Sequence, residues 1–126
     1  MGIERLIEEA KRDKDLLALI LFGSRGRGEE TQVSDVDVCV VLYPGKRDPL
    51  SLSHKRLKYL EIGDFDVHIY QQLPLFIQKR ILKEGKVLYC RDEDILYEVA
   101  FRTAQAFEDF KHIYNSYLEE VARAGP

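Results

Sequence analysis

Residues 16–42 read LLALILFGSRGRGEETQVSDVDVCVVL, and the succession of strand, turn and strand in this stretch decides the fold. Its first seven residues form a continuous apolar run of strand length, which predicts a strand covered on both faces. Glycines at positions 23, 26 and 28 then break the pattern. From residue 35 polar and apolar side chains alternate, which predicts a second strand over residues 35–42 with Asp35, Asp37 and Cys39 on one face.

The segments on either side alternate between helical and strand-like patterns. Apolar residues at helical spacing predict helices, and Asp48 followed by Pro49 is typical of a helix start. The predicted helices cover residues 3–14, 49–60, 74–84 and 92–123, and the predicted strands cover residues 65–70 and 87–89, the last at a sheet edge. We therefore expect an α/β (α+β) fold, in which helices flank a small mixed sheet of three to four strands.

The bulk properties indicate one folded domain that spans residues 1–126. Hydrophobic residues make up 45% and charged residues 33%, which argues against disorder. A formal net charge of −3 argues against general nucleic-acid binding. Because the charged N-terminus is no signal peptide and the longest apolar run is too short to span a bilayer, we expect no membrane association and a cytoplasmic location.

Three aspartates are the candidate catalytic and metal-binding residues. Alternate residues of a strand share a face about 6.6 Å apart, so Asp35 and Asp37 should project side by side. If the third strand pairs with the second, Asp66 reaches the same space, because neighbouring strands lie about 4.8 Å apart. Such a cluster is tolerable when a cation binds in it, and Mg²⁺ is the natural candidate because it prefers oxygen ligands. Two Mg²⁺ ions could activate an attacking hydroxyl and stabilise a leaving pyrophosphate.

Two neighbours of Asp66 leave alternatives open. Asp64 competes with it for the third position, and we prefer Asp66 because Asp64 adjoins the turn at Gly63. His68 is expected on the same strand face as Asp66, where it either lines the nucleotide site or is an ordinary polar residue at the sheet edge. An Asp-x-Asp pair alone is typical of a solvated strand end, and the third aspartate on the next strand favours the metal site.

The glycine-rich turn is the candidate phosphate-binding segment. Gly23 lets the backbone approach a phosphate closely, and free N–H groups at the start of a helix bind anions. The Ser24 hydroxyl can add a donor, and Arg25 and Arg27 can add positive charge. Alone, this composition is typical of a flexible turn, but the aspartates that follow it favour phosphate binding.

A Gly-Ser pair, ten residues and then Asp-Val-Asp, at residues 23–37, resembles the signature of the DNA polymerase β-like nucleotidyltransferase superfamily. The short chain and the stretch LKEGKVLY at residues 82–89 resemble its minimal nucleotidyltransferase (MNT) branch. The resemblance implies that Asp35, Asp37 and Asp66 ligate the metals and that Asp66 also helps to deprotonate the attacking hydroxyl. It further implies that Gly23 and Ser24 hold the β- and γ-phosphates of ATP, the expected co-substrate.

The resemblance also implies a partner. Many members of the MNT branch are antitoxins that pair with a HEPN-domain ribonuclease toxin and silence it by adenylylating a tyrosine. Because the chain consists of the catalytic domain alone, a protein substrate supplied by such a partner is favoured. Two alternatives stay open: transfer to a small hydroxyl compound such as an aminoglycoside, and a non-catalytic adaptor that binds nucleotide or a partner. The intact set of three aspartates argues against the adaptor.

The predicted C-terminal helix is long for a domain of this size. It would extend about 48 Å at 1.5 Å per residue, whereas the domain is only about 35 Å across. The helix must therefore bend and pack internally, or its end must overhang. We favour the overhang, in which apolar residues dock a second copy of the chain or the toxin; these residues are Phe110, Ile113, Tyr114, Tyr117 and Leu118.

Overall fold

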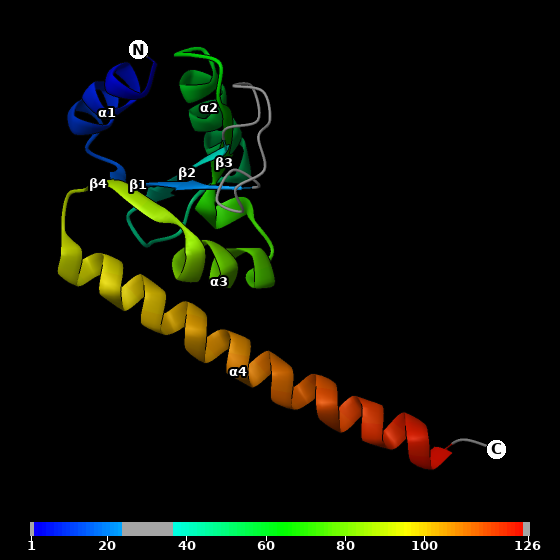
Figure 1. Ribbon diagram of the computed structural model, residues 1–126. Coiled ribbons are helices and arrows are strands. Elements are labelled where there is room, and N and C mark those ends of the chain that lie inside the picture. The colour runs from blue at the N-terminus through cyan, green and yellow to red at the C-terminus, as the bar shows by residue number, and fades with distance from the viewer. Residues whose placement is uncertain (1, 24–36, 125–126) are drawn as a thin grey trace.

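The computed structural model describes residues 2–23 and 37–124, in which a mixed sheet carries helices on both faces (Figure 1). The four strands run in the spatial order β3-β2-β1-β4. They are β1 (Leu16–Phe22), β2 (Asp37–Leu42), β3 (Asp66–Ile69) and β4 (Lys86–Cys90). Strand β1 is antiparallel to both of its neighbours, whereas β2 and β3 are parallel. The predicted mixed sheet, the pairing of the second and third strands and the edge position of the fourth are confirmed.

Two helical layers explain why β1 is apolar without alternation. Helices α1 (Gly2–Arg12) and α2 (Pro49–Leu60) cover one face of the sheet, and α3 (Leu75–Glu84) and the first part of α4 (Glu93–Ala124) cover the other (Figure 1). Leu16 and Leu19 of β1 belong to the first core, and Leu17 and Ile20 belong to the second. All four side chains leave water on folding, which is the dominant stabilising contribution for residues of this kind.

Two predicted elements end earlier than expected. The first helix stops at Arg12 rather than residue 14, because Asp13 begins a turn in which its Oδ1 accepts the backbone N–H of Asp15 at 3.0 Å. The third strand stops at Ile69, and Tyr70–Gln72 forms a short 3-10 helix. Tyr70 is buried there, and its hydroxyl forms a hydrogen bond with Thr103 of α4. A long-range contact therefore overrides the local strand pattern.

Asp13 anchors the end of α1 to α2. Its carboxylate accepts hydrogen bonds from Tyr59 Oη at 2.7 Å and Lys55 Nζ at 3.0 Å. Burial raises the pKa of this carboxyl, but the hydrogen bonds from Tyr59, Lys55 and the Asp15 N–H, together with the positive charge of Lys55, hold the pKa of Asp13 below its ordinary value. The negative charge is therefore stabilised in the folded state.

Arg91 forms a second long-range link to α1. One terminal nitrogen of its guanidinium, Nη2, donates to the carbonyl oxygens of Ala10, Lys11 and Asp13 at 3.1, 3.1 and 2.9 Å. Its Nε donates to the carbonyl oxygen of Leu16 at 3.1 Å. Carbonyls at a helix end have no partner within the helix, and Arg91 binds two of these in α1, together with the carbonyl of Asp13 in the turn that follows.

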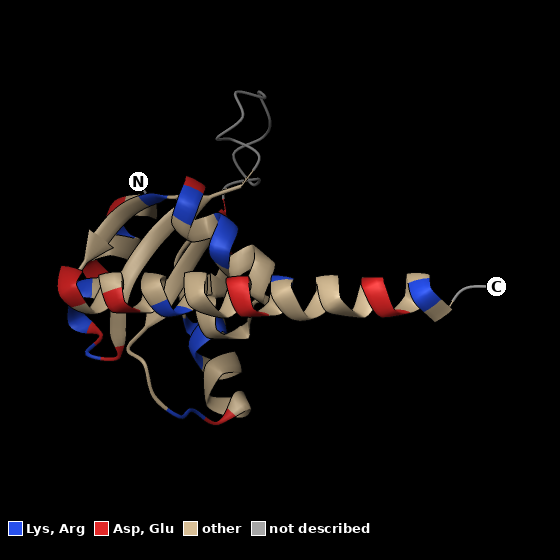
Figure 2. Cartoon of the chain, turned by 90° about the horizontal axis from the view of Figure 1, so that it is seen from below, with Lys and Arg blue, Asp and Glu red and all other residues tan. Residues whose placement is uncertain are grey.

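Helix α4 is one continuous element of 32 residues that projects beyond the rest of the domain (Figures 1 and 2). Val99 and Thr103 of its first half are buried, whereas every side chain from residue 108 to residue 124 is exposed. The prediction that the end of this helix overhangs the domain is thus confirmed, and the alternative of a bent, internally packed helix is wrong. In residues 2–23 and 37–124, no helix has the length and apolar character needed to cross a membrane.

Candidate active site

The candidate site lies where β2 and β3 begin and β1 ends. Asp37 and Asp66 are the first residues of two parallel neighbours, and they face each other directly in the register. Phe22, the last residue of β1, pairs with Asp37 from the other side. Gly23 follows Phe22, so the start of the predicted phosphate turn adjoins the carboxylates. The strand order therefore brings together Gly23, Asp37 and Asp66, as the sequence pattern requires.

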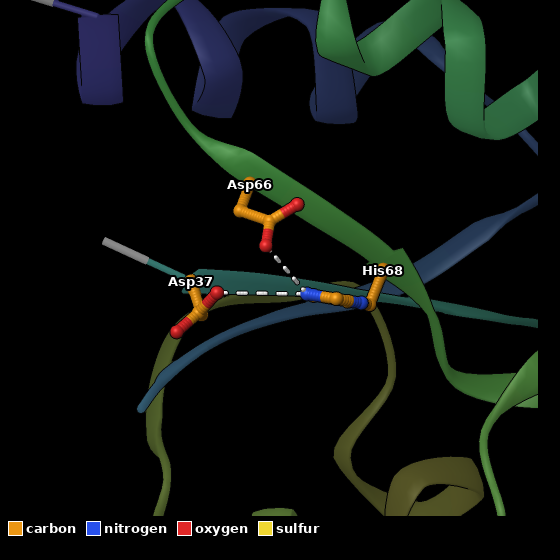
Figure 3. Close-up of side chains that lie close together, drawn as sticks. All are labelled: Asp37, Asp66 and His68. Carbon is orange, nitrogen blue, oxygen red and sulfur yellow. Dashed lines mark ion pairs between the residues drawn. The ribbon is translucent and has the colours of Figure 1, made fainter. Parts of the chain in front are cut away.

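His68 completes a compact group with the two aspartates (Figure 3). Its Nε2 lies 3.2 Å from Asp66 Oδ2 and 3.5 Å from Asp37 Oδ1. One potential ligand atom from each residue falls within 4.8 Å of the others. Of the two interpretations of His68, the one that places it in the site agrees with this geometry.

The electrostatics of the group favour a cation. Burial and the negative charge of Asp66 raise the pKa of the Asp37 carboxyl, and His68 partly offsets both effects. A raised pKa indicates that the Asp37 carboxylate lacks sufficient compensating positive charge. The carboxylate oxygens are the donors that Mg²⁺ and Mn²⁺ accept, so Asp37 and Asp66 fit a divalent metal ion.

Arg56 of α2 supports this end of the sheet. Its Nε donates to the carbonyl oxygen of Val67 at 2.6 Å, and its Nη2 lies 3.8 Å from Asp66 Oδ1. The Asp66 carboxylate therefore has Arg56 beside one oxygen and His68 beside the other. No motif in the sequence pointed to Arg56. Its signal was a cation at helical spacing from Leu52 and Tyr59, the buried residues of α2.

Gly23 has a steric role at this site that is independent of its expected contact with phosphate. Its φ of +116° is one that L side chains rarely adopt. A Cβ at this position would also overlap Oδ2 of Asp37 and lie 3.2 Å from its Cγ. A side chain at residue 23 would therefore force the Asp37 carboxylate to shift.

The remaining predicted residues are placed differently. Asp35, Ser24 and Arg25 lie outside the described residues. Asp64 is exposed in the bend before β3 and does not belong to the group that could hold a cation among residues 2–23 and 37–124. Asp66 is the carboxylate that faces Asp37.

A profile of the family described as "Polymerase beta, Nucleotidyltransferase" matches residues 4–94. The chain belongs to this nucleotidyltransferase family. The chain is accordingly an enzyme. The resemblance of residues 23–37 to the nucleotidyltransferase signature is confirmed at the level of the family. The matched residues end in the first turn of α4, so the projecting part of that helix lies beyond the family profile.

Comparisons with individual proteins agree with this assignment. The nucleotidyltransferase is 29% identical, over 116 residues, to a candidate protein adenylyltransferase of Methanocaldococcus jannaschii, and the alignment covers 84% of this chain and 85% of the relative. Its fold matches a structure described as a toxin–antitoxin with AMP-PNP, with a TM-score of 0.65, 19% identity and 96% of each chain covered. It also matches a structure of a tri-AMPylated Shewanella oneidensis HEPN toxin in complex with MNT antitoxin. There the TM-score is 0.63, the identity is 19%, and 97% of this chain and 99% of the other are covered.

Proposed function

We propose that this nucleotidyltransferase is an antitoxin that transfers AMP from ATP to a tyrosine hydroxyl of a HEPN-domain toxin in a Mg²⁺-dependent reaction. The observation that carries the proposal is the direct register of Asp37 with Asp66 beside Gly23. A protein acceptor is supported by the similarity to a candidate protein adenylyltransferase. A HEPN toxin is supported by the likeness to the complex of a HEPN toxin with MNT antitoxin.

In the proposed reaction the tyrosine oxygen attacks the α-phosphorus of ATP. An oxygen–phosphorus bond forms, the bond from the α-phosphorus to the bridging oxygen breaks, and pyrophosphate leaves. The hydroxyl proton passes to the Asp66 carboxylate, which acts as general base. Asp35, Asp37 and Asp66 would hold two Mg²⁺ ions, which would supply positive charge against the phosphates and the attacking oxygen. Gly23 and Ser24 bind the β- and γ-phosphates, and Arg25 adds positive charge.

The projecting half of α4 is the surface that we assign to the toxin. Its apolar and aromatic side chains are 45% to 67% exposed; they are Phe110, Ile113, Tyr114, Tyr117, Leu118 and Val121. Positions 110, 114, 117 and 121 continue, at helical spacing, the face on which Val99 and Thr103 pack against the domain. A partner on this face would therefore extend an existing apolar layer, and an unpartnered surface of this kind is unusual on a monomer.

The test is transfer of label from ATP carrying radioactive α-phosphate. The chain is incubated with Mg²⁺ and either cell extract or a purified HEPN-domain protein. We expect a labelled protein band of the toxin's size, absent with Asp37→Asn and retained with the matched control Asp64→Asn. A labelled small molecule in place of a protein would support the aminoglycoside-like alternative. Absence of any transfer would contradict the proposal.

A further inference from the structure

His68 adds a nitrogen donor to a site that otherwise supplies carboxylate oxygens. Its side chain is only 27% exposed, and its ring meets the Phe22 ring edge to face, with centroids 5.6 Å apart and planes at 62°. On its own strand pair His68 lies opposite the fully buried Cys39. The sheet and Phe22 therefore restrict the imidazole, and its Nε2 points toward the carboxylates and not into the core (Figure 3).

Two of the three separations in this group are close to those between ligands around one ion. Adjacent ligands of an octahedral ion, each about 2.1 Å from the metal, are about 3.0 Å apart. The separations of His68 Nε2 from Asp66 Oδ2 and Asp37 Oδ1, 3.2 and 3.5 Å, are close to that value. Since the nitrogen is at nearly the same distance from both carboxylates, small movements would bring all three atoms onto one metal ion.

We propose that His68 is a direct ligand of the metal ion bound by Asp37 and Asp66, and that it shifts the preference of this site from Mg²⁺ toward divalent transition metals such as Mn²⁺. Imidazole binds transition metals well, whereas Mg²⁺ strongly favours oxygen. The inference rests on the proposed function only in requiring that the two aspartates bind metal. It adds which ion the site prefers and which side chain determines that preference.

Pulsed EPR of Mn²⁺ bound to the chain tests the ligand directly. Inorganic triphosphate replaces ATP, so that no nucleobase nitrogen can contribute to the spectrum. We expect coupling of Mn²⁺ to an imidazole ¹⁴N nucleus in the unmodified chain and its loss in His68→Gln. The chain has three histidines, and His112→Gln, on the exposed half of α4, is the control that should retain the coupling.

Calorimetric titration supplies a second readout. His68→Gln should weaken Mn²⁺ binding by about tenfold or more, because loss of a residue that only orients a metal ligand already has an effect of this size. The same substitution should change Mg²⁺ binding less. A spectrum of the unmodified chain without nitrogen coupling, with Mn²⁺ binding still abolished by Asp37→Asn, would overturn the role of His68 and leave the proposed function intact. Mn²⁺ and Mg²⁺ binding that is unaffected by Asp37→Asn would overturn both.

Discussion

Replacing Gly23 with alanine tests whether the phosphate turn and the carboxylates act as one site. The φ of +116° is strained for any L side chain, and such strain costs about 1–3 kcal/mol of folding free energy. The new Cβ would also overlap Oδ2 of Asp37 and lie 3.3 Å from its Cβ. Relief requires the carboxylate to move on the order of 1 Å, and a misplacement of that size costs about 100-fold in rate. We therefore expect Gly23→Ala to be modestly destabilised and about 100-fold slower in AMP transfer.

The assay compares initial rates of AMP transfer at saturating ATP with the free energy of unfolding in urea. Gly45→Ala is the matched control, because Gly45 also has a strained φ, +147°, but no atom of the described residues lies within 4 Å of its added Cβ. The control should lose similar stability and keep its transfer rate. A Gly23→Ala chain with the unmodified rate, or a Gly45→Ala chain that is equally slow, would refute the steric reasoning.

Three further perturbations address the other parts of the structure. Asp66→Asn should lower kcat by about 100-fold or more while changing the Kd for ATP little, because it removes the general base; Asp64→Asn should retain activity. Asp13→Asn should lower the free energy of unfolding by about 2 kcal/mol at neutral pH, since it removes charged hydrogen bonds. Because the folded-state pKa of Asp13 is lowered, this difference should shrink as pH falls from the ordinary value of 3.8 toward the folded-state pKa, below which the aspartate is protonated in both states. Truncation after Asp109 should weaken toxin binding in a pull-down assay but preserve ATP binding, since the side chains of residues 110–124 are exposed.

Each of these expectations has a contradicting outcome. An inactive Asp64→Asn chain beside an active Asp66→Asn chain would exchange their roles. A stability difference at Asp13 that is constant with pH in urea unfolding would mean that its charge contributes nothing. A truncated chain that unfolds, or that binds the toxin with full affinity, would remove the docking role from the end of α4.

Local patterns predicted the elements well where one interaction dominates. The unbroken apolar run at residues 16–22 corresponds to β1 residue for residue, because burial on both faces leaves no position for a polar side chain. Tyr70 departs from the structure that its local pattern predicts. It continues the alternation of β3 in the sequence, but burial of its ring and its hydrogen bond to Thr103, thirty-three residues away, turn it into a 3-10 helix. No local pattern encodes a contact of that separation.

In the candidate site, too, local patterns predict some residues, whereas others depend on tertiary packing. Period-two spacing was enough to place His68 on the face of Asp66, and strand pairing was enough to bring Asp66 to Asp37. The contact between Arg56 and β3 depends on how α2 is rotated on the sheet, which the packing of Leu52 and Tyr59 determines. Sequence spacing could identify Arg56 as a cation on an apolar helix face. It could not predict that the Val67 carbonyl oxygen accepts its hydrogen bond.

Arg91 has a consequence for how the molecule unfolds. Arg91 lies between β4 and α4. Its guanidinium donates hydrogen bonds to backbone carbonyls near the end of α1, the first of which is that of Ala10. Fraying of α1 would deprive this guanidinium of partly buried acceptors, so we expect the end of α1 and the start of α4 to open together. Amide protons in the last turn of α1 and the first turn of α4 should therefore exchange with solvent at similar rates. The stability of the start of α4, the projecting helix, would then depend on the stability of α1.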